Sequence, residues 1–317
     1  MKKFFAFILI VFVASVVVSL TYVDRALFKS VVTESVVFEI QKGGSAQKTA
    51  QKLADQKFVS HPILALLAMR FYGFDKNLKA GEYLIEKGMT LKDILQKLTS
   101  GKVIMHQLTL PEGLTTAQML ALIEQNEFLS GTVTQNVLEG EMLPETYTFA
   151  KGKTKDSIIK NAKADMQKAL DEIWQKRAEG LPLKDKNELL ILASIIEKET
   201  GVNAERQMVA SVFINRLNID MPLQTDPTVI YAITGGKTDL KRSLKRNDLS
   251  IDSPYNTYLY KGLPPTPICS PGKAALEAAA DPAQTQYLYF VADGKGGHRF
   301  AKTLSEHNEN IRLWLKK

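Results

Sequence analysis

The sequence predicts an α+β fold that follows an N-terminal transmembrane helix. Three observations lead to this prediction. Residues 4–23 carry no charge, units of strand, glycine turn and capped helix recur between about residues 35 and 125, and residues 187–201 are apolar on nearly every face of a helix. With 317 residues and a 45% hydrophobic share, the chain is long enough for two compact domains and too apolar for general disorder.

The N-terminal apolar segment has the length of a membrane span. Two lysines precede residues 4–23, and Asp24 and Arg25 follow them. A helix of about 20 apolar residues crosses a bilayer, and the positive-inside rule leaves the short N-terminus in the cytoplasm. A cleaved signal peptide is the alternative, but its apolar core is usually shorter and no clear cleavage site follows. We expect residues 1–25 to form a cytoplasmic tip and an uncleaved anchor.

Composition excludes several classes of site. The net charge of +7 is spread along the chain without a dense basic block, so we expect no nucleic-acid binding. An anionic membrane or wall polymer could attract this charge, which also suits a solvated surface. Cys269 is the single cysteine, so an internal disulfide is impossible. The four histidines lack the spacing of metal ligands, and we expect no metal and no cofactor.

A strand, a glycine turn and a Ser/Thr-capped helix recur three times. The strands lie at residues 36–40, 83–85 and 108–110, and the expected N-cap residues are Ser45, Thr90 and Thr115. This unit resembles the LysM module, a small fold that binds cell-wall glycans. A plain βα packing unit without a ligand is the alternative.

The segment of residues 187–201 predicts a buried helix with one carboxyl on an apolar stripe. Gly201 is expected to end this helix. Leu190 and Ile196 flank the stripe, whose members recur at helical spacing: Leu189, Ala193, Glu197 and Thr200.

The position of Glu197 favours acid catalysis. A dry environment raises the pKa of a carboxyl, and the negative end of the helix dipole acts in the same direction. A glutamate that keeps its proton near neutral pH can donate it to a leaving oxygen. The alternative is a glutamate that reaches solvent or pairs with Lys198 or Arg206.

Three later segments supply polar loop residues. Asp226 is an apparent N-cap with Pro227 at the first helical position, which leaves Gln224 free to face a ligand. The proline-stiffened loops of residues 252–258 and 262–267 carry tyrosine and amide side chains, and such side chains suit a carbohydrate. Taken alone, these loops could equally be ordered connections. Residues 287–301 form a β-hairpin with Asp293–Gly297 at its turn.

Several long motifs occur in an order that resembles the YceG-like family of endolytic murein transglycosylases, of the membrane-bound lytic transglycosylase G type. They are EGEMLPETYTF, LASIIEKETG, NRLNIDMPLQTDPTVIYAI, DSPYNTYLYKGLPPTPI with the following SPG, and YFVADGKGGHRF. The resemblance extends from about Val36 to the C-terminus. One departure is Thr266, where we expect glycine, and it puts the geometry of that loop in doubt.

The resemblance implies a domain order and a location. It predicts a single-pass anchor over residues 1–25 in the bacterial inner (cytoplasmic) membrane. A LysM-like domain over residues 26–103 follows. Residues 104–317 then form a mixed α/β catalytic domain with a lysozyme-like helical active-site core, on the periplasmic side. Implied partners are peptidoglycan glycan strands, the membrane and peptidoglycan synthases.

The resemblance also implies a reaction. A lyase of this family cuts the β-1,4 bond between N-acetylmuramic acid and N-acetylglucosamine within nascent strands. It leaves 1,6-anhydro ends, which would terminate strand elongation. Glu197 matches the family's essential glutamate and would act first as acid and then as base. Our candidates for orienting the sugar are Gln224, Tyr255, Asn256 and Tyr258.

Two other functions stay open at this point. A hydrolytic muramidase would use a second carboxylate, such as Asp226 or Glu205, to activate water. A non-catalytic membrane-anchored scaffold that binds peptidoglycan would need neither carboxylate.

Overall fold

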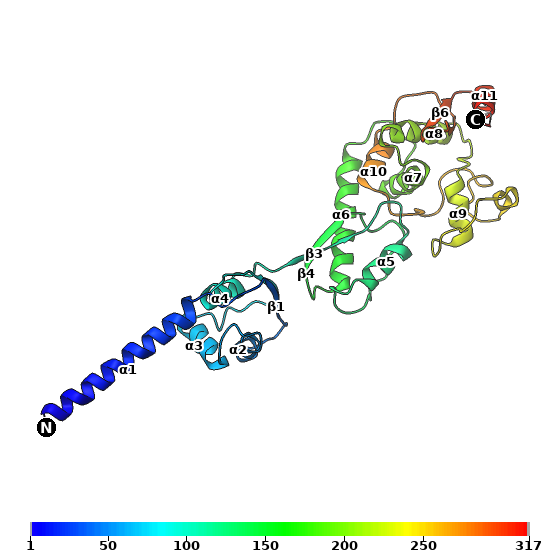
Figure 1. Cartoon of the computed structure of the whole chain (residues 1–317). Helices are drawn as coiled ribbons and strands as arrows, with labels where there is room; N and C mark the ends of the chain where they lie inside the picture. Colours follow the sequence, from blue (N-terminus) through cyan, green and yellow to red (C-terminus); the bar gives the residue numbers. More distant parts are fainter. Residues whose placement is uncertain (1, 316–317) are drawn as a thin grey trace. The chain divides into compact units, whose positions relative to one another are not determined.

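The chain folds as two units, each with its own core, and its described residues form a mixed α/β structure of eleven helices and small sheets (Figure 1). The computed structural model describes residues 2–315, with the side chains of residues 7–315 apart from 16, 19, 20, 23, 24, 26 and 28. Unit 1 comprises residues 1–106 and 148–152, and unit 2 comprises residues 107–147 and 153–317.

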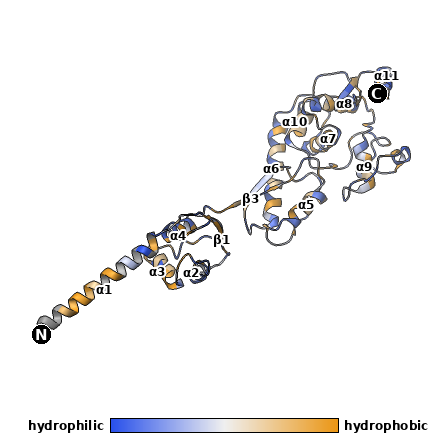
Figure 2. Cartoon of the chain, in the orientation of Figure 1, coloured by the Kyte–Doolittle hydropathy of each residue, from blue (hydrophilic) through white to orange (hydrophobic). Residues whose placement is uncertain are grey.

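The first helix, α1 (Lys2–Phe28), is coloured mainly as apolar in Figure 2. Among the residues that the structure describes, no helix combines the length and the apolar character that crossing a membrane requires. This finding does not support the predicted membrane anchor. Leu27, at the end of α1, is buried in the core of unit 1.

Unit 1 contains a two-stranded sheet covered by short helices. Strands β1 (Val36–Ile40) and β2 (Gly81–Ile85) pair antiparallel, with Phe38 opposite Tyr83. Both of these rings are fully buried. The helices of the unit are α2 (Ala46–Asp55), α3 (Pro62–Phe71) and α4 (Leu91–Ser100).

The predicted caps of unit 1 are confirmed. The Ser45 hydroxyl accepts the Lys48 N–H at the start of α2, and the Thr90 hydroxyl accepts the Asp93 N–H at the start of α4. The first two predicted repeats therefore form one sheet with a capped helix after each strand.

The third predicted repeat lies in unit 2 from residue 107 onward, whereas residues 105 and 106 at the start of its strand belong to unit 1. Its strand, β3 (Met105–Thr109), pairs with β4 (Thr146–Ala150) instead of extending the sheet of β1 and β2. The helix after this strand, α5 (Thr116–Gln125), begins at the predicted cap, because the Thr115 hydroxyl accepts the Gln118 N–H. The same local pattern thus serves in two different folding units.

Unit 2 is organised around α7 (Lys186–Glu199), which packs against α6 (Lys155–Gln175), α8 (Arg206–Asn218), α9 (Asp226–Thr234) and α10 (Lys273–Ala280) (Figure 1). All residues from Leu189 to Ile196 are buried, which confirms the prediction of a helix buried among others. The Thr154 hydroxyl accepts the Ser157 N–H and caps the start of α6.

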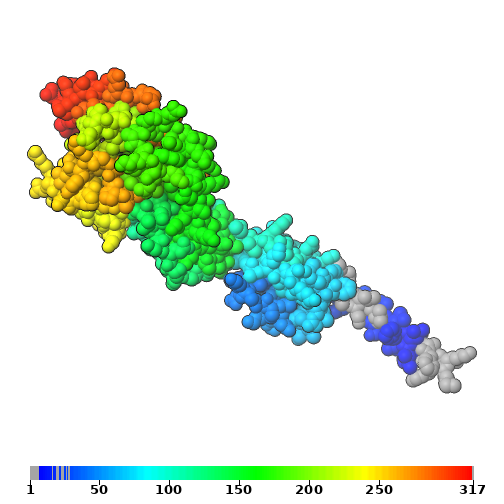
Figure 3. Space-filling model, turned by 180° about the vertical axis from the view of Figure 1, so that it is seen from behind, coloured from blue at the N-terminus to red at the C-terminus, as the bar shows by residue number. Residues whose placement is uncertain are grey.

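The remaining elements of unit 2 surround this bundle. The predicted hairpin is confirmed as β5 (Tyr289–Ala292) paired antiparallel with β6 (His298–Ala301), and α11 (Leu304–Leu315) comes after it. Two short 3-10 turns cover Asn203–Glu205 and Arg246–Ser250. In Figure 3 the yellow and orange loop segments of unit 2 lie against its green helical part.

Candidate active site

Glu197 lies in the last turn of α7, and its side chain is 7% exposed. Its Oε2 accepts a hydrogen bond of 3.0 Å from the Gly272 N–H, just before α10. Its Oε1 lies 3.5 Å from Nη2 of Arg206, at the start of α8. Three segments of unit 2 therefore position this carboxyl, and none of them leaves it in open solvent.

Burial raises the pKa of Glu197 above its ordinary value, because the charged form loses contact with water. The hydrogen bond from Gly272 and the charge of Arg206 favour the ionised form and oppose this rise, whereas the negative charge of Glu112 adds to it. The net direction is upward, as the helix pattern predicted. A carboxyl of this kind retains more proton at neutral pH than an exposed glutamate does.

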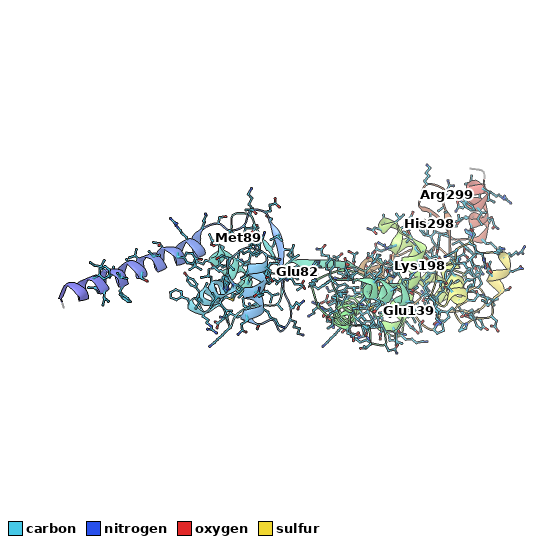
Figure 4. The ribbon with its side chains drawn as sticks, turned by 60° about the horizontal axis from the view of Figure 1, so that its bottom comes forward. Glu82, Met89, Glu139, Lys198, His298 and Arg299 are labelled. Carbon is cyan, nitrogen blue, oxygen red and sulfur yellow. The ribbon has the colours of Figure 1, made fainter. Side chains whose placement is uncertain are left out.

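Backbone hydrogen bonds join residues 113–114 to Ser270 beside Glu197. The Gly113 N–H donates to the Ser270 carbonyl at 3.0 Å, and the Ser270 N–H donates to the Leu114 carbonyl at 2.8 Å. Lys198, labelled in Figure 4, donates from Nζ to the Gly113 carbonyl at 3.2 Å. These bonds fix residues 112–114 next to the end of α7.

Sequence reasoning missed Glu112, whose carboxylate Oε2 lies 3.8 Å from Arg206 Nη2. The available signal was its position directly before Gly113, the turn glycine of the third repeat. That signal identifies a turn, but it does not reveal which distant segment the turn contacts.

The end of α7 differs from the prediction in one detail. The helix ends at Glu199 with Thr200 as an extended cap residue, and Gly201 does not adopt the left-handed conformation expected of a helix stop. Asn203 does not cap α8 with its side chain either. Its carboxamide oxygen accepts a bond from the Arg206 guanidinium instead, so it orients a residue of the site.

Glu199, two residues after Glu197, contacts a different loop. The Thr225 hydroxyl donates a hydrogen bond to its carboxylate. Burial raises the pKa of Glu199 to about 7, the charge of Asp226 adds to the rise, and the charges of His298 and Arg216 oppose it. The last turn of α7 therefore presents two carboxyls with raised pKa values to two separate segments.

Gln224 has an exposed side chain on a constrained backbone. Its φ angle is +48°, a left-handed value that non-glycine residues rarely adopt. The Gln224 N–H donates to the Thr257 carbonyl at 3.1 Å, and the Thr225 N–H donates to the Thr257 hydroxyl at 3.1 Å. Bonds on successive residues maintain this conformation and direct the carboxamide away from the core.

Tyr258 and Asp226 meet across the two loops. The Tyr258 hydroxyl donates to Oδ1 of Asp226 at 2.7 Å. Asp226 is the first residue of α9, and Thr225 is the N-cap residue, without a side-chain capping bond. The prediction that Asp226 caps this helix is therefore wrong, since its carboxylate binds a tyrosine instead. Gln224 and Tyr258 stay predictions as substrate-binding residues.

Asn256 supports its loop. It is fully buried, its amide donates to the carbonyls of Leu249 and Ile251, and its oxygen accepts the Tyr258 N–H. The loop backbone uses both amide donors, and substrate binding by Asn256 stays a prediction.

Tyr255 is half-buried and packs against the core of unit 2. Its ring centroid lies 4.9 Å from that of Tyr231, and its hydroxyl shares a 2.7 Å hydrogen bond with Thr266. Thr266, the residue that departs from the expected glycine, thus gives Tyr255 a partner. This bond directs the Tyr255 hydroxyl to its own loop, and substrate binding by Tyr255 stays a prediction.

A third carboxyl with a raised pKa lies in the motif EGEMLPETYTF. Glu139, labelled in Figure 4, accepts the Thr116 N–H at 2.7 Å and the Tyr231 hydroxyl at 3.2 Å. Burial raises its pKa. These bonds link α5 to α9, so we interpret Glu139 as a support of the site.

Comparisons with known proteins give one family. The profile described as the YceG-like family matches residues 38–313. A protein of Bacillus subtilis called "Endolytic murein transglycosylase" is 38% identical over 73% of this chain and 71% of its own length. A protein of Streptococcus pneumoniae with the same name is 31% identical over 87% of this chain, and the match covers 58% of the relative's length.

A solved structure is also similar. The crystal structure of a YceG-like protein from Listeria monocytogenes shares 33% identity with this chain. The alignment covers 87% of this chain and 99% of that protein, with a TM-score of 0.51.

Proposed function

Because this chain belongs to the YceG-like family, we propose that it is an endolytic murein transglycosylase that cuts within peptidoglycan glycan strands. The observation that carries the mechanism is the Glu197 carboxyl, which is buried at the end of α7 with a raised pKa. The names of the relatives supply the reaction class, and this carboxyl supplies a residue able to perform it.

In the proposed reaction, Glu197 donates its proton to the oxygen that links N-acetylmuramic acid to N-acetylglucosamine. The bond between that oxygen and C1 of the muramic residue breaks, and positive charge develops on the sugar ring. The ionised Glu197 then takes the proton of the muramic C6 hydroxyl, whose oxygen closes on C1. The glutamate ends as it began, and no water is consumed.

The residues around Glu197 suit both halves of this cycle. Burial favours the protonated state that donates, whereas the Gly272 N–H and the Arg206 guanidinium stabilise the carboxylate that remains afterwards. Gln224 and Tyr258, on loops of the same unit, are the proposed sugar-orienting residues. Orientation of the C6 hydroxyl towards C1 would supply a large part of the rate.

The product decides between this reaction and hydrolysis. Mass spectrometry of digested glycan strands separates 1,6-anhydro ends from reducing ends, because the two differ by one water. Anhydro ends that disappear with the Glu197→Gln variant are the expected result. Reducing ends alone would assign the chain to the muramidase alternative, in which Asp226 or Glu205 would activate water.

Both carboxylates that could activate water in the muramidase alternative already have hydrogen-bond partners in the structure. Glu205 accepts the His298 backbone N–H at 2.9 Å and contacts the His298 ring at 2.7 Å, while Asp226 binds Tyr258.

A non-catalytic scaffold is the other alternative. In that case, a folded Glu197→Gln protein would replace the wild type fully in cells.

Location and partners complete the proposal. We place residues 1–25 in the bacterial inner membrane and the rest of the chain on its outer side, on the basis of the charge-free residues 4–23 that come after two lysines. Unit 1 would act as a LysM-like domain next to nascent strands, unit 2 would be built on a lysozyme-like helical core, and peptidoglycan synthases are the proposed partners. Retention of residues 4–23 in the mature protein, and of the protein in membranes after a high-salt wash, tests the anchor.

A further inference from the structure

Glu112 shares both of its close neighbours with Glu197. A Cβ atom added to Gly272 would lie 1.7 Å from Oε1 of Glu112, so the Glu112 carboxyl occupies the space that any side chain at position 272 would need. The backbone of Gly272 is ordinary, with φ of −74°. Glycine is therefore required at position 272 because the Glu112 carboxyl lies so close to its Cα, and not because of its backbone conformation. The Gly272 N–H also donates to Glu197.

Arg206 is the second shared neighbour. Its Nη2 lies 3.5 Å from Glu197 Oε1 and 3.8 Å from Glu112 Oε2. The guanidinium is buried, and Asn203 binds its Nη1. Its Nε has no hydrogen-bond acceptor among the described residues. One positive charge thus faces two carboxyls and fully neutralises neither.

The surroundings of the two carboxyls differ. The Glu112 side chain is 47% exposed, whereas that of Glu197 is 7% exposed. Two neighbouring carboxyls in unlike surroundings usually divide into one that keeps its proton and one that stays ionised. Glu112 is the exposed member of this pair, and Glu197 is the buried one.

We propose that Glu112 is a positioning residue of the reaction, whose negative charge competes for Arg206 and so keeps the proton on Glu197 until the sugar bridge accepts it. This inference rests on the proposed function, with Glu197 as the acid. Glu112 itself takes no part in the proton transfer. When Glu197 becomes a carboxylate, Arg206 can move towards it, since Glu112 is stabilised by solvent.

The charged and titratable groups around Glu197 come from four segments. Arg206 on α8 lowers its pKa, and Glu112 on the loop before α5 raises it. Lys198 on α7 donates to the Gly113 carbonyl. Cys269, before α10, has a thiol whose pKa burial raises, so it stays neutral. Glu112 is therefore the negative charge in this set that a single substitution can remove.

The test is the pH profile of kcat/KM for the full-length Glu112→Gln variant on purified glycan strands. Glutamine preserves the shape over Gly272 and removes the charge. Without the negative charge of residue 112, the alkaline limb of the kcat/KM profile should move to lower pH. At pH 7 to 8, kcat/KM should then be about 3- to 10-fold below that of the wild type, whereas on the acidic plateau the two proteins should agree within about twofold. Glu179→Gln, at an exposed position of the same unit, is the matched control and should leave the profile unchanged.

Two results would overturn the proposal. One is a Glu112→Gln profile that superimposes on the wild type, and the other is an equal loss at every pH, which would indicate a merely structural role. If Glu112→Gln fails to fold, Gly272→Ala replaces it, because the added methyl displaces the Glu112 carboxyl. The same limb must then shift in the same direction. Failure of the proposed function looks different, since the wild type itself would then release no anhydro ends.

Discussion

The second and third strand–glycine–helix repeats share a local pattern but perform different tasks. In unit 1, the N–H of the turn glycine Gly88 donates to the Val32 carbonyl, and Thr90 caps α4. In unit 2, the N–H of Gly113 donates to the Ser270 carbonyl, and Thr115 caps α5. The first turn closes a small core, whereas the second borders Glu197.

The two turns differ in the distant segments that they contact. The Thr115 hydroxyl also donates to the Gly236 carbonyl at 2.6 Å, and Glu112 faces Arg206. The hydroxyl of Thr90 instead bonds to Asp93 of its own helix at 2.7 Å. A repeated local motif therefore specifies a turn and a helix start, while its tertiary contacts decide whether that turn belongs to a packing unit or to a catalytic site.

Removal of the Glu197 carboxyl should give the largest difference in activity between a substitution in unit 2 and one in unit 1. Glu197→Gln is expected to lower kcat/KM by roughly 10²- to 10⁴-fold, because a glutamine cannot donate the proton. Glu86→Gln, which removes an exposed carboxyl from unit 1, is expected to leave the rate unchanged. Measured rates of anhydro-end release test both variants, and a comparable loss in Glu86→Gln would place chemistry in unit 1.

Core truncation should separate the stabilities of the units. Leu95→Ala in unit 1 and Leu192→Ala in unit 2 each empty a fully buried position and should cost about 2–5 kcal/mol. Both tryptophans, Trp174 and Trp314, lie in unit 2, so denaturation monitored by their fluorescence reports that unit alone. Leu192→Ala should lower the denaturation midpoint measured by fluorescence, whereas Leu95→Ala should leave this midpoint unchanged. A shift with both variants would mean that the units unfold together.

Local features were predictable where a few neighbouring residues determine them. The caps at Ser45, Thr90 and Thr115 each depend on a hydrogen bond to the backbone N–H three residues later, and all three are confirmed. The buried α7 was predictable because its apolar residues cover nearly every face.

The errors arise where tertiary partners compete with local ones. Asp226 has the sequence context of a helix cap, but Tyr258 binds its carboxylate. Both amide donors of Asn256 bind carbonyls of its own loop, a contact that the sequence did not reveal. Glu112 reaches the site only through Arg206 and Gly272, which are far away in the sequence, so no local pattern could identify it.

A third prediction concerns pH and distinguishes the two carboxyls in the last turn of α7. Folding raises the pKa of Glu199 from 4.5 to about 7, so the folded state keeps a proton that the unfolded state releases. Stability of unit 2 should therefore fall as pH rises from about 4.5 to 7, by up to about 3 kcal/mol. Glu199→Gln should reduce this slope, because glutamine has no proton to release.

Tryptophan fluorescence in urea between pH 5 and 8 measures this effect. The comparison needs only the wild type and Glu199→Gln, since other titrating groups contribute equally to both. Equal slopes for the two proteins would show that Glu199 does not titrate in this range.

The smallest effect should come from the caps, and it tests directly whether the two repeats differ. Thr90→Ala and Thr115→Ala each remove one capping oxygen, which typically costs about 1 kcal/mol of stability. Only Thr115→Ala should also lower activity, by about two- to fivefold, because its hydroxyl ties the loop that carries Glu112 to Gly236. Thr115→Ser keeps the hydroxyl and should restore the rate. If Thr90→Ala lowered the rate as much, the third turn would have no special link to the site, and the contrast between the repeats would disappear.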